Sequence, residues 1–398
     1  MTDDTSWLMQ GTPPTGDSIV GVHNWSTYPH LRWGFLHTRE VVPTARIERG
    51  SGPVLELPRA ERDLTSLEFE TAGGRITVGE MIARSYTDGF LVLHDGRIVF
   101  ETYGPGMTPS TTHLLQSVSK SIAGTAAGVV IGEGALTPST LVTDVLPELR
   151  STSFEGATVR HVLDMRTGTA YDETYDSPDA DVFLTEVLAG WRRWKGDPPV
   201  ANVYEQIAAL GNARAHGELF DYRSILTELL GWMLERTSGQ RYPELISRTI
   251  WSQIGAEQDA DITIRHGITL PDGGICVTLR DLARFALMHL REGVAGDRQV
   301  VPREWIMDTR NGDAECRAAF EPTEDEEWMP GGFYRNQWWV LKPGEEYTGL
   351  GIHGQHAYVN VPANVVCVKL STRPAPLDDD LSAATLAAAR AIAEALAG

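Results

Sequence analysis

The sequence predicts an α/β fold in which an antiparallel β-sheet is flanked by helices and interrupted by an inserted, all-helical domain. Strand-like runs occupy both ends of the 398-residue chain, at residues 90–103 and 337–370. Helical patterns dominate between residues 136 and 254. Strands on either side of a helical middle are typical of a sheet domain that another domain interrupts. A functional site would then lie in the crevice between the two domains.

These patterns give a division into two domains. We expect a discontinuous sheet domain formed by residues 1–115 and 262–398, and a helical domain formed by residues 116–261. Within the first part, residues 1–60 are rich in Pro, Gly, Trp and His and show weak periodicity. We expect an irregular segment there that lies over the fold, with Trp25 and Trp33 as packing anchors.

The best-defined local element is a β-hairpin near the N-terminal end of the sheet domain. Two β-rich runs, residues 90–94 and 97–103, are joined by Asp95-Gly96. This dipeptide suits the positive φ angles of a type I′ turn, so the two runs are predicted to pair as antiparallel strands. A short helix is expected just before them, from Gly79 to Tyr86.

The helical middle begins with a run of small and apolar residues that starts at or just after Ser117 and predicts a buried helix. Gly239 is expected to close the helix of residues 225–238 as a C-cap. The further helices are expected at residues 141–147, 158–165, 203–210 and 225–238, and residues 166–170 are expected to form a turn.

The β character returns after Ile262. Thr278 follows a short strand and is expected to cap the helix of residues 279–289, whose apolar residues recur at helical spacing. Three adjacent antiparallel strands are then predicted, with a tight connection at residues 362–364 and an Ala-rich helix after them. The strands are expected at residues 337–341, 351–361 and 365–370, and the helix at residues 381–396.

The composition excludes several classes of function. The formal net charge is −20, from 54 acidic and 34 basic residues, which opposes binding to nucleic acid. No uninterrupted apolar run is long enough to span a bilayer, so no membrane partner is expected. The N-terminus lacks the pattern of a secretory signal. Three distant cysteines predict neither disulfides nor a zinc site, and we expect a cytoplasmic protein without metal or cofactor.

The stretch from His113 to Ser121 carries the strongest chemical signal. Ser117 and Lys120 stand three residues apart, which places both side chains on one face of a helix. The Lys120 amine can then activate the Ser117 hydroxyl, which also lies at the positive end of the helix dipole. A Ser and a Lys at this spacing also occur by chance, so the hypothesis needs further residues.

Two other stretches supply them. Tyr222 precedes a helix, and beside Lys120 its pKa would be lowered so that the phenolate could exchange a proton with Ser117. The alternative is a packing residue. The glycine-dense stretch of residues 348–355 allows close approach of a substrate, and the backbone amides of Ile352 and Ser117 could hold an oxyanion. This stretch could also be a simple turn entering a strand.

Together these motifs resemble the serine β-lactamase and penicillin-recognising superfamily. Ser117-Val-Ser-Lys120 is similar to its first motif, and Tyr222-Arg-Ser224 to its second, Tyr-x-Asn. Residues 133–147 and 158–168 resemble connecting segments of the class C-like esterases. From about Trp33 to Pro374 the chain resembles the 6-aminohexanoate-dimer hydrolases, which are nylon-oligomer-degrading amidases with carboxylesterase activity.

The resemblance implies a β-lactamase-like fold and a set of roles. Ser117 is the implied nucleophile, Lys120 and Tyr222 the implied proton relay, and Ser117 and Ile352 the implied oxyanion hole. A possible homodimer is also implied. The residues implied to bind or surround the substrate are Tyr175, Glu186, Asp272 and Trp339. We expect His353 to line the pocket or to support the residues that line it, rather than to belong to a catalytic triad.

The third superfamily motif departs from its usual Lys-Thr-Gly or His-x-Gly form, because Gly349-Leu-Gly351 precedes Ile352. No cation stands there to bind the carboxylate of a β-lactam, which argues against β-lactamase or transpeptidase activity. We therefore expect a serine hydrolase for small linear amides or esters. The alternatives are a carboxylesterase without amidase activity, and a sensor or binding module that is acylated without turnover.

Overall fold

The computed structural model describes residues 5–398 and is built around one large sheet. The prediction that the N-terminus lacks a secretory signal falls partly on residues 1–4, which lie outside the described residues. The sheet has seven antiparallel strands in the order β12-β13-β14-β15-β16-β4-β5. They are β12 (Phe333–Arg335), β13 (Trp338–Lys342), β14 (Glu346–Gly351), β15 (Gln355–Asn360), β16 (Val365–Ser371), β4 (Thr87–His94) and β5 (Arg97–Tyr103).

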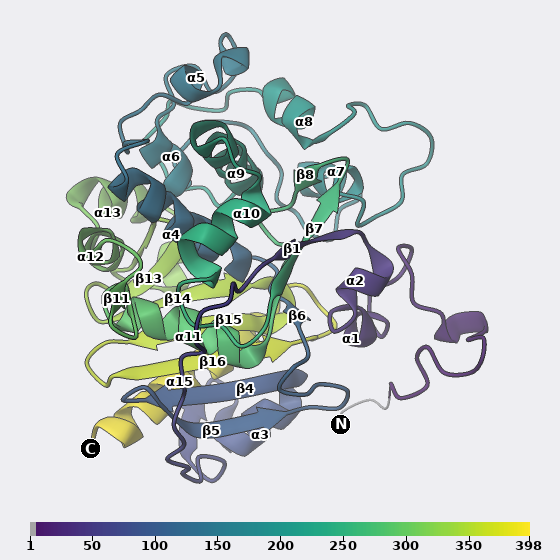
Figure 1. The fold of residues 1–398 in the computed structure, drawn as a ribbon, viewed down its shortest axis with the longest axis vertical. Helices are drawn as coiled ribbons and strands as arrows, with labels where there is room; N and C mark the ends of the chain where they lie inside the picture. Colours follow the sequence, from purple (N-terminus) through teal and green to yellow (C-terminus); the bar gives the residue numbers. More distant parts are fainter. Residues whose placement is uncertain (1–4) are drawn as a thin grey trace.

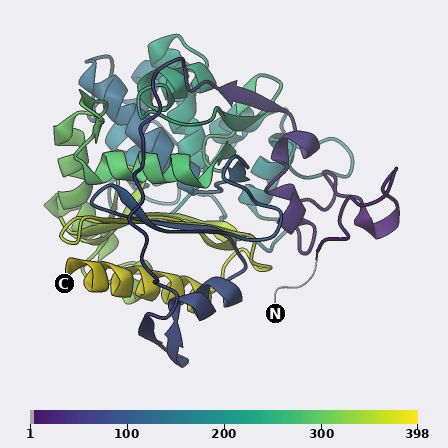
Figure 2. The ribbon, with the colours of Figure 1, turned by 60° about the horizontal axis from the view of Figure 1, so that its bottom comes forward.

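Helices cover both faces of this sheet. Figure 2 shows the sheet nearly edge-on, with α15 (Asp379–Ala397) on one face and α11 (Leu279–Leu290) on the other. Thr278 caps α11, because its hydroxyl accepts a hydrogen bond from the Asp281 amide at 3.2 Å. The predicted α/β fold, with an antiparallel sheet between helices, is confirmed.

The helical middle of the chain lies beyond the α11 face and gathers at the top of Figure 1. Its central helix, α4 (Val118–Gly132), packs against α9 (Ile225–Ser238) on one side and approaches β14 on another. The remaining helices of this part are α5 (Val142–Val145), α6 (Val159–Leu163), α7 (Asp181–Leu188), α8 (Val203–Ala209) and α10 (Tyr242–Ile246). The division of the chain into two domains stays a prediction.

A smaller five-stranded sheet joins the N-terminal segment to the region around α4. Its strands are β1 (Thr44–Ile47), β7 (Ala260–Arg265), β8 (Ile268–Thr269), β9 (Ile275–Val277) and β6 (His113–Leu114). The segment predicted as irregular thus contains β1 and two short helices, α1 (Leu31–Gly34) and α2 (Thr38–Val41). Trp25 is fully buried in a small hydrophobic cluster that is separate from the main core. Trp33 is half-buried and packs against this cluster.

The other elements lie at the periphery. The hairpin of β2 (Glu68–Thr71) and β3 (Gly74–Thr77) precedes α3 (Val78–Arg84), which confirms the helix expected there. Between α11 and the sheet edge the chain forms β10 (Val294–Ala295), β11 (Arg298–Gln299), α12 (Arg303–Asn311), α13 (Ala314–Phe320) and α14 (Asp325–Trp328).

The predicted hairpin of residues 90–103 is confirmed, and its turn residues Asp95 and Gly96 have φ angles of 52° and 74°. The predicted strand 351–361 is wrong at its start. Gly351 ends β14, a 3₁₀ turn of Ile352–Gly354 follows, and β15 begins only at Gln355. β14 also lies between β13 and β15, so the three predicted strands are not all adjacent.

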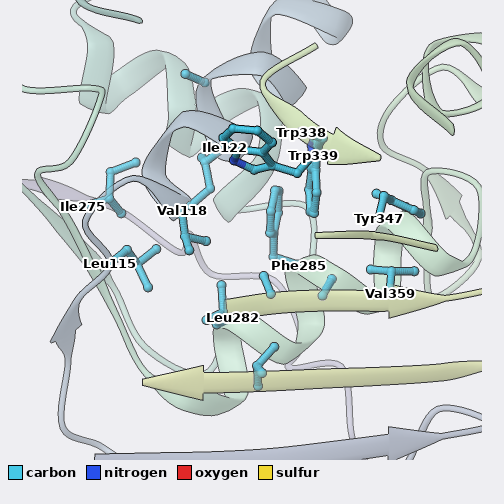
Figure 3. Close-up of a cluster of buried hydrophobic side chains, with 14 of the residues drawn as sticks. Leu115, Val118, Ile122, Ile275, Leu282, Phe285, Trp338, Trp339, Tyr347 and Val359 are labelled. Carbon is cyan, nitrogen blue, oxygen red and sulfur yellow. The ribbon is translucent and has the colours of Figure 1, made fainter. Parts of the chain in front are cut away.

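The hydrophobic core lies between α4, α11 and the sheet (Figure 3). Phe285 of α11 stacks on Trp338 of β13, with the ring centroids 6.0 Å apart. Val118 and Ile122 extend from α4 into the same core, and both are fully buried. This packing fixes the first turn of α4, which carries Ser117 and Lys120.

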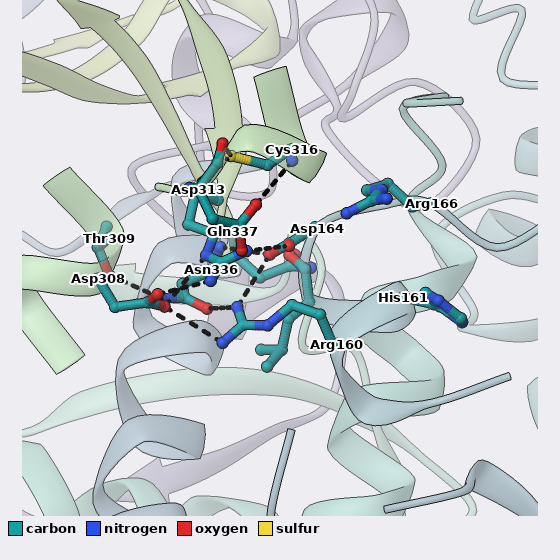
Figure 4. A network of polar contacts seen from close by, with 12 residues as sticks. Arg160, His161, Asp164, Arg166, Asp308, Thr309, Asp313, Cys316, Asn336 and Gln337 are labelled. Atoms are coloured by element: carbon teal, nitrogen blue, oxygen red, sulfur yellow. Dashed lines mark hydrogen bonds and ion pairs between the residues drawn. The ribbon is translucent and has the colours of Figure 1, made fainter. Parts of the chain in front are cut away.

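A polar network holds the turn between β12 and β13 against the helices (Figure 4). Asp164 is fully buried, and its carboxylate accepts hydrogen bonds from the Arg335 guanidinium at 2.9 Å and the Asn336 amide at 3.1 Å. The side chain of Gln337, which follows Asn336, accepts a hydrogen bond from the Thr227 hydroxyl of α9 at 2.7 Å. Its backbone carbonyl accepts from Ser121 of α4 at 2.9 Å. The network therefore ties the sheet edge to α4, α6 and α9.

Candidate functional site

Ser117 and Lys120 meet at the first turn of α4. Ser117 occupies the N-cap position, and Lys120 follows one turn later in the same helix. The Lys120 ammonium donates a hydrogen bond to the Ser117 hydroxyl, with 2.8 Å between Nζ and Oγ. The Lys120 side chain is almost completely buried, while Ser117 is half-buried and lines a pocket. The predicted neighbourhood of these two side chains is present in the structure.

Acidic and aromatic groups surround the Lys120 ammonium. It donates to the backbone carbonyl of Asp272 at 3.0 Å and lies 3.5 Å from the Asp272 carboxylate. Its Nζ atom is 5.3 Å from the centroid of the Tyr222 ring. Burial works against the charge, but Tyr222, Asp272 and Glu173 favour it more strongly, so the pKa of Lys120 lies above its usual value.

Tyr222 lies in the loop before α9 and stacks on Trp339 of β13, with 5.4 Å between the ring centroids. Burial raises the pKa of the Tyr222 phenol. The Lys120 charge and the interactions with Ser117 and Lys120 lower it, but they do not overcome burial. The expectation that Lys120 would bring the phenol pKa below its ordinary value is therefore wrong, because desolvation of the phenolate outweighs the attraction of the ammonium.

Ser117 lines a pocket with a volume of about 350 Å³, which includes space open to solvent. The pocket brings together four of the sequence-predicted residues with Ser117. These are Tyr175, Glu186, Asp272 and Ile352. The other lining residues are Gln116, Val182, Thr185, Trp191, Ser224, Leu270 and Gly273.

Two of the predicted pocket residues, Trp339 and His353, are not among the lining residues. Trp339 supports Tyr222 from the sheet side. His353 is next to Ile352 in the chain, but its ring packs edge-on against Phe35, and its Nδ1 lies 2.7 Å from the carbonyl oxygen of Arg373. Burial lowers the pKa of His353 to about 4, so its imidazole is neutral at physiological pH.

The sequence reasoning missed two acidic residues near Lys120. Glu173 accepts hydrogen bonds from the Ser224 amide and the Tyr175 hydroxyl, each at 2.8 Å, and from the Ser224 hydroxyl. Glu228 of α9 is buried and accepts from the Asp272 amide at 3.0 Å. Glu173 stands in a long loop and carries no motif. Glu228 carried one local signal, because a Glu within the apolar face of a predicted helix is unusual.

In the second motif, Tyr222-Arg-Ser224, the serine that replaces asparagine makes specific contacts in the structure. Ser224 stands where the resembled superfamily has Asn, and its hydroxyl and amide both donate to the Glu173 carboxylate. Burial raises the pKa of Glu173, while the Lys120 charge and the Ser224 contacts lower it. Glu173 therefore interacts both with Ser224 and Tyr175, through hydrogen bonds, and with Lys120, through its charge.

Among residues 5–398, no group of His, Cys, Asp and Glu side chains is arranged to hold a metal ion. Over the same residues, none of the helices combines the length and the apolar character needed to cross a bilayer.

Known proteins share sequence and fold with this chain. The chain is 36% identical over 373 residues to the 6-aminohexanoate-dimer hydrolase of Paenarthrobacter ureafaciens, covering 91% of this chain and 89% of that protein. The predicted resemblance to this enzyme is therefore confirmed.

Solved structures share the fold. One is named "Putative 6-aminohexanoate-dimer hydrolase from Bacillus anthracis" and matches with a TM-score of 0.87 at 24% identity, covering 96% of this chain and 98% of that one. Another, a hydrolase with promiscuous acyltransferase activity, matches with a TM-score of 0.61 at 16% identity, over 80% of this chain and 96% of that one. The family model described as Beta-lactamase matches residues 80–392, and the chain therefore belongs to the beta-lactamase family.

Proposed function

We propose that this chain is a serine hydrolase that cleaves small esters and amides through an acyl-enzyme at Ser117. The observation that carries the proposal is the 2.8 Å contact between Lys120 Nζ and Ser117 Oγ, beside a pocket that Ser117 lines. The 36% identity to a 6-aminohexanoate-dimer hydrolase supports linear amides as one class of substrate.

Lys120 and Tyr222 would act together as the base. Both pKa values lie above their ordinary values, so the resting site holds an ammonium and a neutral phenol. Loss of one proton from this pair produces the reactive form. The pair then takes the Ser117 proton as Oγ attacks the substrate carbonyl, which is general base catalysis of a nucleophile.

The tetrahedral intermediate requires donors for its oxyanion. Ser117 and Ile352 line the same pocket, and their backbone amides would supply two hydrogen bonds. A donor of this kind typically contributes about 3–4 kcal/mol to the stability of the transition state. Tyr222 would return the proton to the leaving group, and water would then release the acyl group from Ser117.

Substitution of Ser117 tests the proposal. We expect S117A to lose at least about a thousandfold of kcat/KM for p-nitrophenyl acetate, since no other group can form the acyl-enzyme. Circular dichroism should show an unchanged fold. Ser110 is exposed on a loop seven residues earlier, so S110A is the matched control. Turnover retained by S117A would reject Ser117 as the nucleophile.

A substrate panel separates the alternatives. An amidase should hydrolyse a linear amide, either the 6-aminohexanoate dimer or its analogue with an uncharged hexanoyl group in place of the aminohexanoyl group, whereas a pure carboxylesterase would cleave only butyrate esters. An acylated sensor would bind a serine-directed phosphonate at Ser117 but would show a single turnover. We expect multiple turnovers, because the pocket is open to solvent and water can reach the acyl group.

A further inference from the structure

The pocket contains an ion pair that bears on the charge of its substrate. Glu186 of α7 lines the pocket, and its carboxylate is paired with the Arg192 guanidinium from the turn after the helix. The two side chains are largely sheltered, with exposed fractions of 16% for Glu186 and 28% for Arg192. Arg192 also lies over the Phe183 ring, 5.1 Å from its centroid, which holds the guanidinium in place.

The acidic groups of the pocket are already in use. Asp272, the other carboxylate in the lining, is paired with Lys120 at 3.5 Å. Glu173 accepts three hydrogen bonds from two lining residues, Ser224 and Tyr175. A substrate ammonium would therefore meet carboxylates that are already paired or hydrogen-bonded, and it would approach two cations, Arg192 and Lys120.

We propose that Arg192 determines the class of substrate by occupying Glu186, so that the pocket prefers an uncharged acyl chain to one that ends in an ammonium. The inference rests on the proposed function, because it concerns the acyl group that Ser117 would receive. To bind at Glu186, an ammonium would have to displace the guanidinium, which offers a planar, multidentate partner for the carboxylate.

Two esters of equal chain length provide the test. p-Nitrophenyl hexanoate and p-nitrophenyl 6-aminohexanoate differ only in the terminal ammonium, and the measured quantity is the ratio of their kcat/KM values at pH 7. We expect the wild-type protein to favour the hexanoate at least tenfold. In R192Q the Glu186 carboxylate loses its fixed cation, and the ratio should shift at least tenfold toward the aminohexanoate.

Three variants make the result specific. R193Q alters the exposed neighbouring arginine and should leave the ratio unchanged. The double variant R192Q/E186Q should lose the shift, because no carboxylate remains for the ammonium. R192M, which keeps much of the side-chain length, replaces R192Q if that variant does not fold.

The outcomes separate this inference from the proposed function. If the wild-type protein cleaves both esters but shows no preference, or if R192Q and R192M leave the ratio unchanged, the role of Arg192 is rejected and the hydrolase remains. If the wild-type protein cleaves neither ester, the proposed hydrolase is rejected, and the inference about its acyl group is rejected with it.

Discussion

Lys120 is a buried cation whose charge depends on its neighbours. Its side chain is 1% exposed, which alone would favour the neutral amine. Tyr222, Asp272 and Glu173 more than compensate for burial, so the pKa of the ammonium is raised. The proton on Lys120 is thus controlled by side chains from three separate segments of the chain.

Replacing Asp272 by Asn should shift the pH dependence of activity. The substitution removes a negative charge 3.5 Å from the Lys120 ammonium, so the pKa of Lys120 should fall. The base would then become available at lower pH, and the acidic limb of the kcat/KM profile should move to lower pH. Profiles of ester hydrolysis between pH 5 and pH 10 measure this shift.

Asp297 offers a control for that experiment, because it is exposed in the turn between β10 and β11. D297N removes the same charge and should leave the profile unchanged. A D272N profile that coincides with the wild-type profile would mean that the Asp272 charge does not act on the base.

At the residue scale, the sequence predicts contacts between residues that are close along the chain, but not contacts between distant segments. The Ser117–Lys120 contact could be predicted because both residues belong to one helical turn. The direction of the Tyr222 pKa shift could not, because it depends on burial by Trp339 and neighbouring elements. Glu173 and Glu228 were missed for the same reason, since their partners Ser224 and Asp272 are 51 and 44 residues away.

At the scale of elements, α4 depends on its glycines. A Cβ atom added at Gly124 would lie 2.1 Å from the Asn336 carbonyl oxygen, and one at Gly128 would lie 2.3 Å from the Trp305 ring. These glycines let the β12–β13 turn and α12 approach the helix closely. The run of small residues that predicted a buried helix thus also reflects the contacts that position its first turn.

G124A should therefore destabilise the protein although alanine favours helices. The gain in helix propensity is about 1 kcal/mol, but overpacking against a backbone carbonyl typically costs about 1–3 kcal/mol. We expect a lower Tm by thermal unfolding. Gly79 in α3 gives a graded comparison, because its added Cβ would lie 3.1 Å from the Thr65 oxygen and G79A should cost less. A Tm for G124A at or above that of the wild type would contradict this account.

Close approach also explains why β14 was missed. Its sequence contains Gly349 and Gly351, and glycine weakens the pattern that identifies a strand. A Cβ atom at Gly349 would lie 2.9 Å from the Ser121 hydroxyl, so the strand needs glycine in order to pass beside α4. The hairpin of β4 and β5 was predictable because its turn and its strands carry agreeing local signals.

At the scale of the whole molecule, Glu228 links folding to pH. Its side chain is 1% exposed, and burial, together with the nearby Asp272, raises its pKa well above the ordinary value of 4.5. The folded protein therefore keeps Glu228 protonated to a higher pH than the unfolded chain does. The stability that this protonated group contributes is complete below the unfolded pKa and is lost as pH rises toward the folded pKa.

E228Q should remove this dependence, because glutamine has the same shape and is neutral in both states. Its Oε1 can still accept from the Asp272 amide, now at 3.0 Å. Over the window between the two pKa values, one bound proton corresponds to about 1.4 kcal/mol per pH unit. The advantage of E228Q over the wild type in free energy of unfolding should therefore grow by about that amount per unit. Urea unfolding from pH 5 to pH 8 measures it.

The surface variant E327Q provides the matched comparison, since Glu327 is exposed on α14. Its stability curve should run parallel to that of the wild type, because its side chain is exposed to solvent in the folded protein as it is in the unfolded chain. If the E228Q curve also runs parallel, Glu228 would have to be ionised in the folded protein. The Glu228 carboxylate would then share the positive charge of Lys120 with Asp272, so the contact between Lys120 and Asp272 would not be a simple ion pair.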